Sequence, residues 1–372
     1  MAKRVLITGG AGFIGSHLTD ELIRCGYKVR VLDNLSEQVH GKNCKRPDYL
    51  HPEAELIVGD VRDKDIVKES LKGIDAVYHF AALVGVGQSM YKVNDYVDVN
   101  NTGTSVLLEA LVEKPVRKLV VASSMSIYGE GLYLDKQGNK IMHCERKLED
   151  LKKSNWELYN QNGHELIPVP TTEDKHPSLS SIYALTKYDQ EKMCLMIGQA
   201  YNIPTVAMRF FNVYGTRQAL SNPYTGVLAI FASQLLNNNQ PMVFEDGLQQ
   251  RDFINVKDVA KACRLALEKE KATGEVFNVG SGNKYTINEI ATCLAGVTGN
   301  HHILPKVTGK YRVGDIRHCF SDMTKSREIL GFVPEISFEE GLTELAEWLQ
   351  DQSASDHVSK ASKELETRGL TV

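Results

Sequence analysis

Short apolar runs alternate with amphipathic stretches along the first half of the chain. The runs have the length of buried strands, and the stretches between them repeat apolar residues roughly every three or four positions. The apolar runs predict strands over residues 4–8, 28–32, 55–58, 75–79, 117–122 and 205–210. The amphipathic stretches predict helices over residues 13–25, 63–71, 95–112 and 181–201. This alternation predicts an α/β fold in which a doubly wound parallel sheet carries helices on both faces.

The pattern lapses between residues 130 and 172, where the chain is polar and charged. A connection of this length in a compact fold is usually functional or mobile. Because it directly precedes Tyr183, we interpret it as a lid or flank of an active-site mouth. A solvated surface excursion is the alternative.

After about residue 213 the elements come in irregular order. The pattern predicts helices over residues 226–237, 256–269 and 286–298, and strands over 242–244, 252–255 and 275–279. We interpret residues 1–212 as one domain and residues 213–350 as a smaller α/β substrate-binding lobe, with segment 252–269 returning to the main sheet. The polar tail, residues 351–372, is expected to be loose or a frayed helix.

A glycine-rich turn, TGGAGFIGSH at residues 8–17, joins the first predicted strand to the first predicted helix. Glycine tolerates positive φ and lets the backbone approach a ligand closely. The helix N-terminus then presents free N–H groups to a pyrophosphate. The next strand ends in Asp33, 18 residues after Gly15, near the spacing of roughly 20 for a carboxylate that binds the adenosine ribose. A carboxylate also repels a 2′-phosphate, so we expect a Rossmann-type site for NAD rather than NADP.

A second group of residues suggests acid–base chemistry. Tyr183 and Lys187 lie four residues apart in a predicted helix and so share one face. The ammonium group is expected to stabilise the phenolate and to lower the tyrosine pKa, which makes Tyr183 a general base. Ser124 follows the predicted strand 117–122, at the edge of the sheet where ligands bind. Its hydroxyl is placed to hydrogen-bond a substrate oxygen.

Composition and charge exclude several partners. The 372 residues carry a formal net charge of -4, which provides no basic field for nucleic acid or an anionic membrane. No apolar stretch reaches the roughly 18 residues that a membrane helix needs, and we expect a cytoplasmic protein. The seven cysteines are odd in number and lack metal-ligand spacing, so we expect reduced thiols and no metal site.

Further motifs make the chain resemble the extended short-chain dehydrogenase/reductases, within them the NAD-dependent nucleotide-sugar epimerase/dehydratase family. The resemblance covers about residues 3–350. Its motifs are TGGAGFIGSH at 8–17, Asp33, Gly59-Asp60-Val61, His79-Phe80-Ala81-Ala82, NNTGT at 100–104, SSMSIYG at 123–129, YALTK at 183–187, RFFNVYG at 209–215, Arg251-Asp252-Phe253 with Val256-Lys257-Asp258-Val259, and RVGDIR at 312–317.

The resemblance implies three sets of site residues. The catalytic set is Ser124, which polarises the substrate hydroxyl, Tyr183, which is the base, and Lys187, which also holds the nicotinamide ribose. The NAD-binding set is Gly9, Gly12, Phe13, Ile14, Gly15, Asp33, Asn34, Asp60, Val61, Phe80, Ala81, Ala82, Asn100, Tyr183 and Lys187. The set that binds a nucleotide-diphosphate sugar is Ser126, Asn212, Arg251, Arg312 and Asp315. Within it the two arginines clamp the diphosphate, because planar guanidinium groups suit phosphate oxygens.

Two departures from the family's dehydratases narrow the expected reaction. Dehydratases carry Asp-Glu directly after the catalytic hydroxyl residue, where this chain has Met125 and Ser126. Neither side chain can act as a carboxyl acid or base, so dehydration is disfavoured. Oxidation at C4 followed by return of the hydride remains, which is 4-epimerisation.

Several segments resemble the dTDP-L-rhamnose 4-epimerase branch of the family, whose product is dTDP-6-deoxy-L-talose. These are the insert at 131–171 and residues 85–90, 222–226 and 243–247. The main alternative is a UDP-hexose or UDP-hexuronate 4-epimerase. The next alternative is a nucleotide-4-keto-sugar reductase. A non-enzymatic NAD-sensing scaffold is disfavoured, because such proteins often lack the intact set of Ser124, Tyr183 and Lys187.

The family also implies a homodimer, in which helices near 101–112 and 183–199 pair across the interface. The apolar residues expected there are Val106, Leu107, Leu111, Met193, Leu195, Met196 and Ile197. The alternative is that both helices are simply buried in the monomer.

Overall fold

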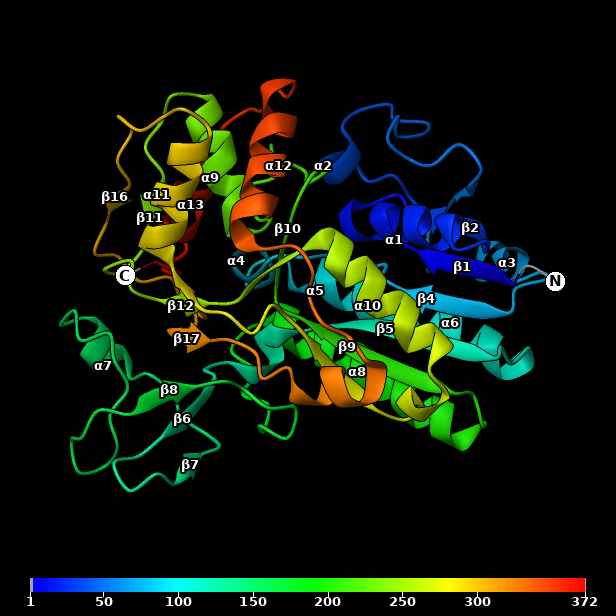
Figure 1. The fold of residues 1–372 in the computed structure, drawn as a ribbon, viewed down its shortest axis with the longest axis horizontal. Coiled ribbons are helices and arrows are strands. Elements are labelled where there is room, and N and C mark those ends of the chain that lie inside the picture. Colours follow the sequence, from blue (N-terminus) through cyan, green and yellow to red (C-terminus); the bar gives the residue numbers. More distant parts are fainter. Residues whose placement is uncertain (1–2, 372) are drawn as a thin grey trace.

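The computed structural model describes residues 3–371 and is built around a seven-stranded parallel sheet in the order β14-β9-β5-β4-β1-β2-β3 (Figure 1). The strands are β1 (Arg4–Thr8), β2 (Lys28–Asp33), β3 (Glu55–Val58), β4 (Ala76–His79), β5 (Lys118–Ser124), β9 (Thr205–Phe210) and β14 (Val276–Val279). The strands predicted in the first half are confirmed to within about two residues, and so is the α/β fold. The strand order reverses between β1 and β4, where ligands bind in folds of this type.

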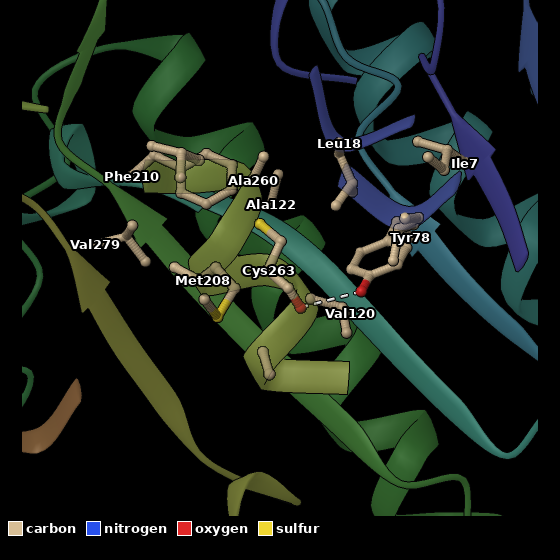
Figure 2. Packing of buried hydrophobic residues seen from close by; sticks show 14 of the residues in the cluster. Ile7, Leu18, Tyr78, Val120, Ala122, Met208, Phe210, Ala260, Cys263 and Val279 are labelled. Atoms are coloured by element: carbon tan, nitrogen blue, oxygen red, sulfur yellow. Dashed lines mark hydrogen bonds between the residues drawn. The ribbon is translucent and has the colours of Figure 1, made fainter. Parts of the chain in front are cut away.

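Helices cover both faces of the sheet. One face carries α1 (Phe13–Arg24) and α10 (Val256–Glu268), and the other carries α3 (Lys64–Ser70), α6 (Gly103–Glu113) and α8 (Ile182–Ala200). Side chains alternate along each strand, so Val5 and Ile7 pack toward α1 whereas Leu6 packs on the opposite face. Figure 2 shows the first of these cores, where the Tyr78 hydroxyl donates to the Cys263 carbonyl at 3.0 Å.

The predicted helix over 95–112 consists of three consecutive helical segments. α5 (Val93–Tyr96) leads into a π-helical turn, η1 (Val97–Thr102), which continues into α6. Such turns often mark functional sites. Gly103 begins α6, and a Cβ there would lie 2.5 Å from Val61 Cγ1. The close approach of α6 to the loop after β3 therefore requires glycine.

Strand β14 lies at the edge of the main sheet beside β9, whereas the sequence placed residues 275–279 in the smaller lobe. The reason is that Phe277 and Val279 are buried in the core beneath α10. Segment 252–269 returns to the sheet as a helix, α10, rather than as a strand. The strand before it, β13 (Phe253–Asn255), pairs instead with β10 (Asn212–Tyr214).

The C-terminal lobe has a core of its own, between α9 (Val227–Leu236), α11 (Ile287–Val297) and α12 (Phe338–Gln350). The hydrophobic pattern did not predict α12, although its capping box between Ser337 and Glu340 is legible in the sequence. Short strands complete the lobe: β11 (Met242–Val243) pairs with β16 (Lys306–Val307), and β12 (Gln250–Arg251) pairs with β15 (Tyr285–Thr286) and β17 (His318–Cys319).

The insert at 130–172 forms a small antiparallel sheet that projects from the body of the molecule (Figure 1). It consists of β6 (Leu132–Leu134), β7 (Lys140–Ile141), β8 (Ile167–Val169) and the helical turn α7 (Leu148–Leu151). Tyr133 is fully buried against Leu158 and Leu166. A packed core of this kind makes the insert an ordered element that can hold neighbouring segments in place.

The polar tail contains α13 (Val358–Thr367), a helix that packs on the rest of the chain through the buried side chains of Ala361 and Leu365. This is more order than its composition suggested. The remaining short helical turns are α2 (Glu37–His40), α4 (Val86–Ser89), η2 (Met125–Tyr128), η3 (Glu270–Ala272) and η4 (Ser326–Leu330). Among residues 3–371, no helix combines the length and the apolar character needed to cross a membrane.

Candidate active site

The glycine turn after β1 forms a narrow cradle. Gly9 has a φ of 70°, and a Cβ there would lie 2.9 Å from the backbone nitrogen of Ala81. A Cβ on Gly15 would lie 2.4 Å from the carbonyl oxygen of Gly9. Helix α1 begins at Phe13, and its N-cap, Gly12, provides no side-chain hydrogen bond. The first N–H groups of α1 therefore face the turn without a side-chain acceptor, which suits a pyrophosphate.

The carboxylate of Asp33 lies where the sequence placed it, at the carboxyl end of β2. One oxygen accepts the Ala11 N–H at 3.0 Å and the other accepts the Leu35 N–H at 2.9 Å. These bonds fix the carboxylate, and lone pairs remain for ribose hydroxyls. Asn34 donates to Asp60 Oδ2 at 3.1 Å, which brings the ends of β2 and β3 together.

Asp60 and Val61 follow β3, beside this carboxylate. Hydrogen bonds from Arg62 lower the pKa of Asp60 to about 2, so Asp60 is ionised and held in place. Arg62 also pairs with Asp98 of η1. Val61 is buried under Gly103, as described above. These two residues thus form a rigid wall next to the ribose position.

The loop after β4 is held by side chains beneath it. The Thr8 hydroxyl accepts the N–H groups of Phe80 and Ala81, each at 3.2 Å. Asn100 is fully buried, accepts the Leu83 N–H at 2.7 Å and donates to the Leu83 carbonyl at 3.2 Å. Asn100 therefore shapes the loop that carries Phe80, Ala81 and Ala82, and its polar atoms are used within the protein.

The catalytic candidates meet at the start of α8. Ser181 caps the helix by accepting the Ala184 N–H at 3.1 Å, and the Tyr183 N–H donates to Ser89 Oγ at 3.0 Å. These bonds fix the backbone of Tyr183. The Ser124 hydroxyl stands at the end of β5, close enough to the Tyr183 phenol to lower its pKa. The structure thus joins two residues that lie far apart in the sequence.

The predicted lowering of the tyrosine pKa is wrong for this structure. Burial raises the pKa of the Tyr183 phenol, and the approach of Ser124 offsets only part of that effect. The Lys187 ammonium is directed to Gln190 Oε1 at 2.6 Å, and burial lowers its pKa to about 8. Desolvation of both groups thus outweighs the expected effect of the lysine charge on the phenol.

The turn after Ser124 is polar but carries no carboxylate. Ser124 Oγ lies 2.8 Å from Ser126 Oγ and accepts the Ser126 N–H at 3.2 Å. The Asn212 amide donates to Met125 Sδ at 3.7 Å and to the Asp252 carbonyl at 3.0 Å. Ser126 is thus adjacent to the Ser124 hydroxyl, and Asn212 contacts the next residue of the same turn, Met125.

The structure brings the two predicted arginine clamps to one segment, residues 312–317. Arg251 donates to the Ile316 carbonyl and, at 2.9 Å, to the Arg317 carbonyl. Arg312 donates to Asp315 Oδ1 at 2.7 Å, and its guanidinium lies 5.5 Å from the centre of the Phe244 ring. The buried Nε of Arg312 has no hydrogen-bond partner within residues 3–371.

A family model described as NAD dependent epimerase/dehydratase family matches residues 5–280. The chain belongs to this family. It is 33% identical over 94% of its length to the dTDP-L-rhamnose 4-epimerase of Burkholderia thailandensis, and 96% of that protein is covered. The epimerase/dehydratase match defines the protein as an enzyme of the isomerase type, with NAD as its cofactor, as the sequence predicted.

Solved structures agree with this assignment. The UDP-glucose 4-epimerase of Thermotoga maritima, solved with UDP-glucose, superposes with a TM-score of 0.76 at 32% identity, covering 93% of this chain and 98% of that one. The UDP-glucose 4-epimerase of Thermus thermophilus, in complex with NAD, gives a TM-score of 0.74 at 30% identity, covering 94% and 99%. The glycine cradle, the uncapped helix and the Asp33 carboxylate described above fit NAD in the present epimerase/dehydratase.

Gln190 is a site residue that the motifs did not reveal. It is fully buried on α8, and its amide nitrogen donates to Thr104 Oγ1 at 2.9 Å and to the Ala81 carbonyl at 3.3 Å. Its oxygen accepts from Lys187. Gln190 therefore links Lys187, the predicted catalytic lysine, to the loop after β4. The only signal in the sequence is its position three residues after Lys187, on the same helix face.

A buried cluster of ionic groups was also missed. It joins the insert to the C-terminal lobe through Arg146, Arg317, Glu130, Glu157, Glu245 and Asp246. Arg146 pairs with Glu245 Oε1 at 2.6 Å and donates to the Asp315 carbonyl at 2.8 Å. Arg317 pairs with Glu245 Oε2 at 3.0 Å. The cluster therefore braces the segment that carries Arg312 and Asp315. Its members lie in segments scattered along the chain, so no local pattern marks them.

Proposed function

We propose that this protein is an NAD-dependent nucleotide-sugar 4-epimerase that interconverts dTDP-L-rhamnose and dTDP-6-deoxy-L-talose, a step in deoxysugar supply for polysaccharide synthesis. The observation that carries the proposal is the approach of Ser124 to Tyr183 beside a turn that lacks the dehydratase carboxylates. The named 4-epimerase relative supports the choice of sugar.

In the forward half-reaction, the Tyr183 oxygen removes the proton from the C4 hydroxyl while Ser124 hydrogen-bonds the same oxygen. Bound NAD supplies a hydride acceptor, and then a donor, at C4. Lys187 is buried and Tyr183 is half-buried, which limits the access of water to the proton transfer. After the sugar ring rotates in the pocket, Tyr183 returns the proton to the C4 oxygen, and the configuration at C4 is inverted.

Arg251 and Arg312 are proposed to hold the diphosphate of the substrate. Both guanidinium groups are anchored on the segment 312–317, and the Arg312 side chain stays 28% exposed, which leaves part of its guanidinium accessible to a phosphate. Ser126 and Asn212 are proposed to contact the sugar, because Ser126 adjoins Ser124 and Asn212 adjoins Met125 in the same turn. The phosphates would then anchor the substrate while the sugar rotates.

A panel of dTDP- and UDP-sugars deuterated at C4 tests this proposal, with NMR spectroscopy of the products. We expect dTDP-L-rhamnose to give the C4 epimer with deuterium retained at C4 and no net change in absorbance at 340 nm. If only UDP-hexoses or UDP-hexuronates react, the proposed substrate is wrong but the proposed 4-epimerisation stands. Stoichiometric use of NADH with a 4-keto sugar would replace the epimerase by a ketoreductase.

We also propose a homodimer through α8 and the neighbouring turn η1. Met196, Leu185 and Val97 are 66%, 38% and 40% exposed, a large apolar surface for a helix pair. Val106, Leu107 and Leu111, which the family pattern had placed in this interface, are buried in the monomer core instead. Light scattering of the native protein and of Met196→Glu tests this, and we expect a dimer that the substitution weakens.

A further inference from the structure

The C-terminal helix α13 packs beside the predicted diphosphate clamp. Leu365 is buried, and a Cβ built on Gly87 would lie 3.4 Å from Leu365 Cδ1 and 3.9 Å from Arg312 Cδ. The Cβ position of this glycine in α4 therefore faces both the tail and the stem of Arg312. Larger residues at position 87 would crowd both.

Polar contacts join α13 to two other segments. The hydroxyls of Tyr91 and Tyr224 lie 2.6 Å apart, and the Tyr91 hydroxyl donates to Glu364 Oε2 at 3.3 Å. The Arg368 guanidinium lies 4.3 Å from the centre of the Tyr91 ring, a cation–π distance. Tyr91 directly follows residues 85–90, and Tyr224 belongs to residues 222–226. The tail therefore contacts two of the segments that distinguish this branch of the family in the sequence.

The last residues of the tail also hold the backbone of the clamp. Thr371 forms an antiparallel bridge with Arg312, and the Val313 N–H donates to the Leu370 carbonyl at 2.9 Å. Arg312 is thus held by the tail at its backbone and by Asp315 at its guanidinium. The tail and the C-terminal lobe meet close together in space (Figure 1).

We propose that residues 358–371 form a wall of the substrate site, which positions Arg312 and retains both the nucleotide sugar and the ketone formed from it. The proposal rests on the proposed function, because it takes Arg312 as a ligand of the diphosphate. Retention matters because a ketone that leaves before it is reduced removes an oxidised sugar and leaves the reduced cofactor, with its two electrons, on the enzyme.

The test uses the full-length variant Leu365→Asp, which places a charge in the contact with α4. Ser359→Asp is the matched control, because it adds the same charge at an exposed position of the same helix. We expect Leu365→Asp to weaken binding of dTDP or UDP by roughly tenfold in calorimetry and to raise KM similarly, because loss of one charge-assisted hydrogen bond to the diphosphate weakens binding by about that factor. It should also accumulate absorbance at 340 nm as ketone escapes. Ser359→Asp should behave as the native protein does.

Unchanged nucleotide binding and unchanged absorbance at 340 nm in Leu365→Asp would overturn the proposal. Failure of the native protein to epimerise any sugar would instead overturn the proposed function, and the binding measurement would still decide the role of the tail. If Leu365→Asp does not fold, the double substitution Glu364→Gln and Arg368→Gln takes its place. It removes the charges of Glu364 and Arg368 beside Tyr91 and leaves Leu365 in place, and we expect a smaller change in the same direction.

Discussion

The predicted NAD-binding half and the proposed substrate-binding half of this enzyme are built in different ways. In the first, each ligand-facing segment directly follows a strand of one parallel sheet, as Gly9 follows β1 and Asp33 ends β2. In the second, Asn212, Arg251 and Arg312 come from separate short elements that touch only in the folded chain. A site at the edge of one sheet is fixed by that sheet, whereas the substrate site depends on ionic and tail contacts that brace it.

Substitution of the proposed base should have the largest effect. Tyr183→Phe removes the hydroxyl and keeps the ring, so the cofactor-binding half should fold and retain NAD. General acid–base catalysis contributes on the order of 100- to 10,000-fold, and we expect kcat to fall by that amount. Turnover assays with saturating substrate measure it. A variant with near-native kcat would show that Tyr183 is not the general base of the reaction.

The ionic cluster provides the sharpest test of bracing in the substrate-binding half. Arg317→Leu leaves Glu245 without one of its partners, and Glu245 is almost fully buried. Breaking a buried pair costs about 3–5 kcal/mol, and urea unfolding should show a loss of that order. We also expect KM for the nucleotide sugar to rise while NAD content stays unchanged. If the variant loses NAD as well as affinity for the nucleotide sugar, the ionic cluster does not support the substrate-binding half alone.

The cofactor-binding half is tested by Asp33→Ala. Loss of the carboxylate removes the expected ribose contact and the repulsion of a 2′-phosphate, so NAD should bind more weakly and NADP more tightly. Calorimetry with both cofactors measures the ratio of the two affinities. Native protein that binds NADP as tightly as NAD would refute this role for Asp33.

The smallest expected effect tests the link between the halves through Gln190. Gln190→Glu places a carboxylate against the Lys187 ammonium, which favours the charged lysine and raises its pKa. The added negative charge also disfavours the Tyr183 phenolate and raises the tyrosine pKa. Because the base must be deprotonated to act, the acidic limb of the kcat–pH profile should move upward by roughly one unit. Gln190→Met, which adds no charge, should lower kcat without this shift.

The other groups near Lys187 do not obscure that measurement. Burial lowers the pKa of His79 to about 3 and raises the pKa of Cys194 to about 12, so both stay neutral around pH 7. Glu191 is paired with Arg209 at 2.7 Å. A movement of the acidic limb therefore reports Lys187 and Tyr183.

Much of the first half could be predicted from the sequence, because its signals are local. Alternating hydrophobicity located the strands of the sheet. The turn at 8–17 and Asp33 predict the NAD site, and the structure gives both a geometry that fits this prediction. The order of the second half was harder, since β14 joins the main sheet through the burial of Phe277 and Val279. Its short strands of two or three residues carry too little pattern to be assigned to a partner.

By itself the sequence determined the fold, the cofactor and the catalytic candidates Ser124, Tyr183 and Lys187, because hydrophobic periodicity and short motifs involve neighbouring residues. Only the tertiary structure decided the pKa values of the site. Burial raises the pKa of Tyr183, and Lys187 donates a hydrogen bond to Gln190. The tertiary structure likewise decided the bracing of Arg312 by the tail. Desolvation and contacts between distant segments depend on what surrounds a residue in space, and no run of neighbouring residues encodes that.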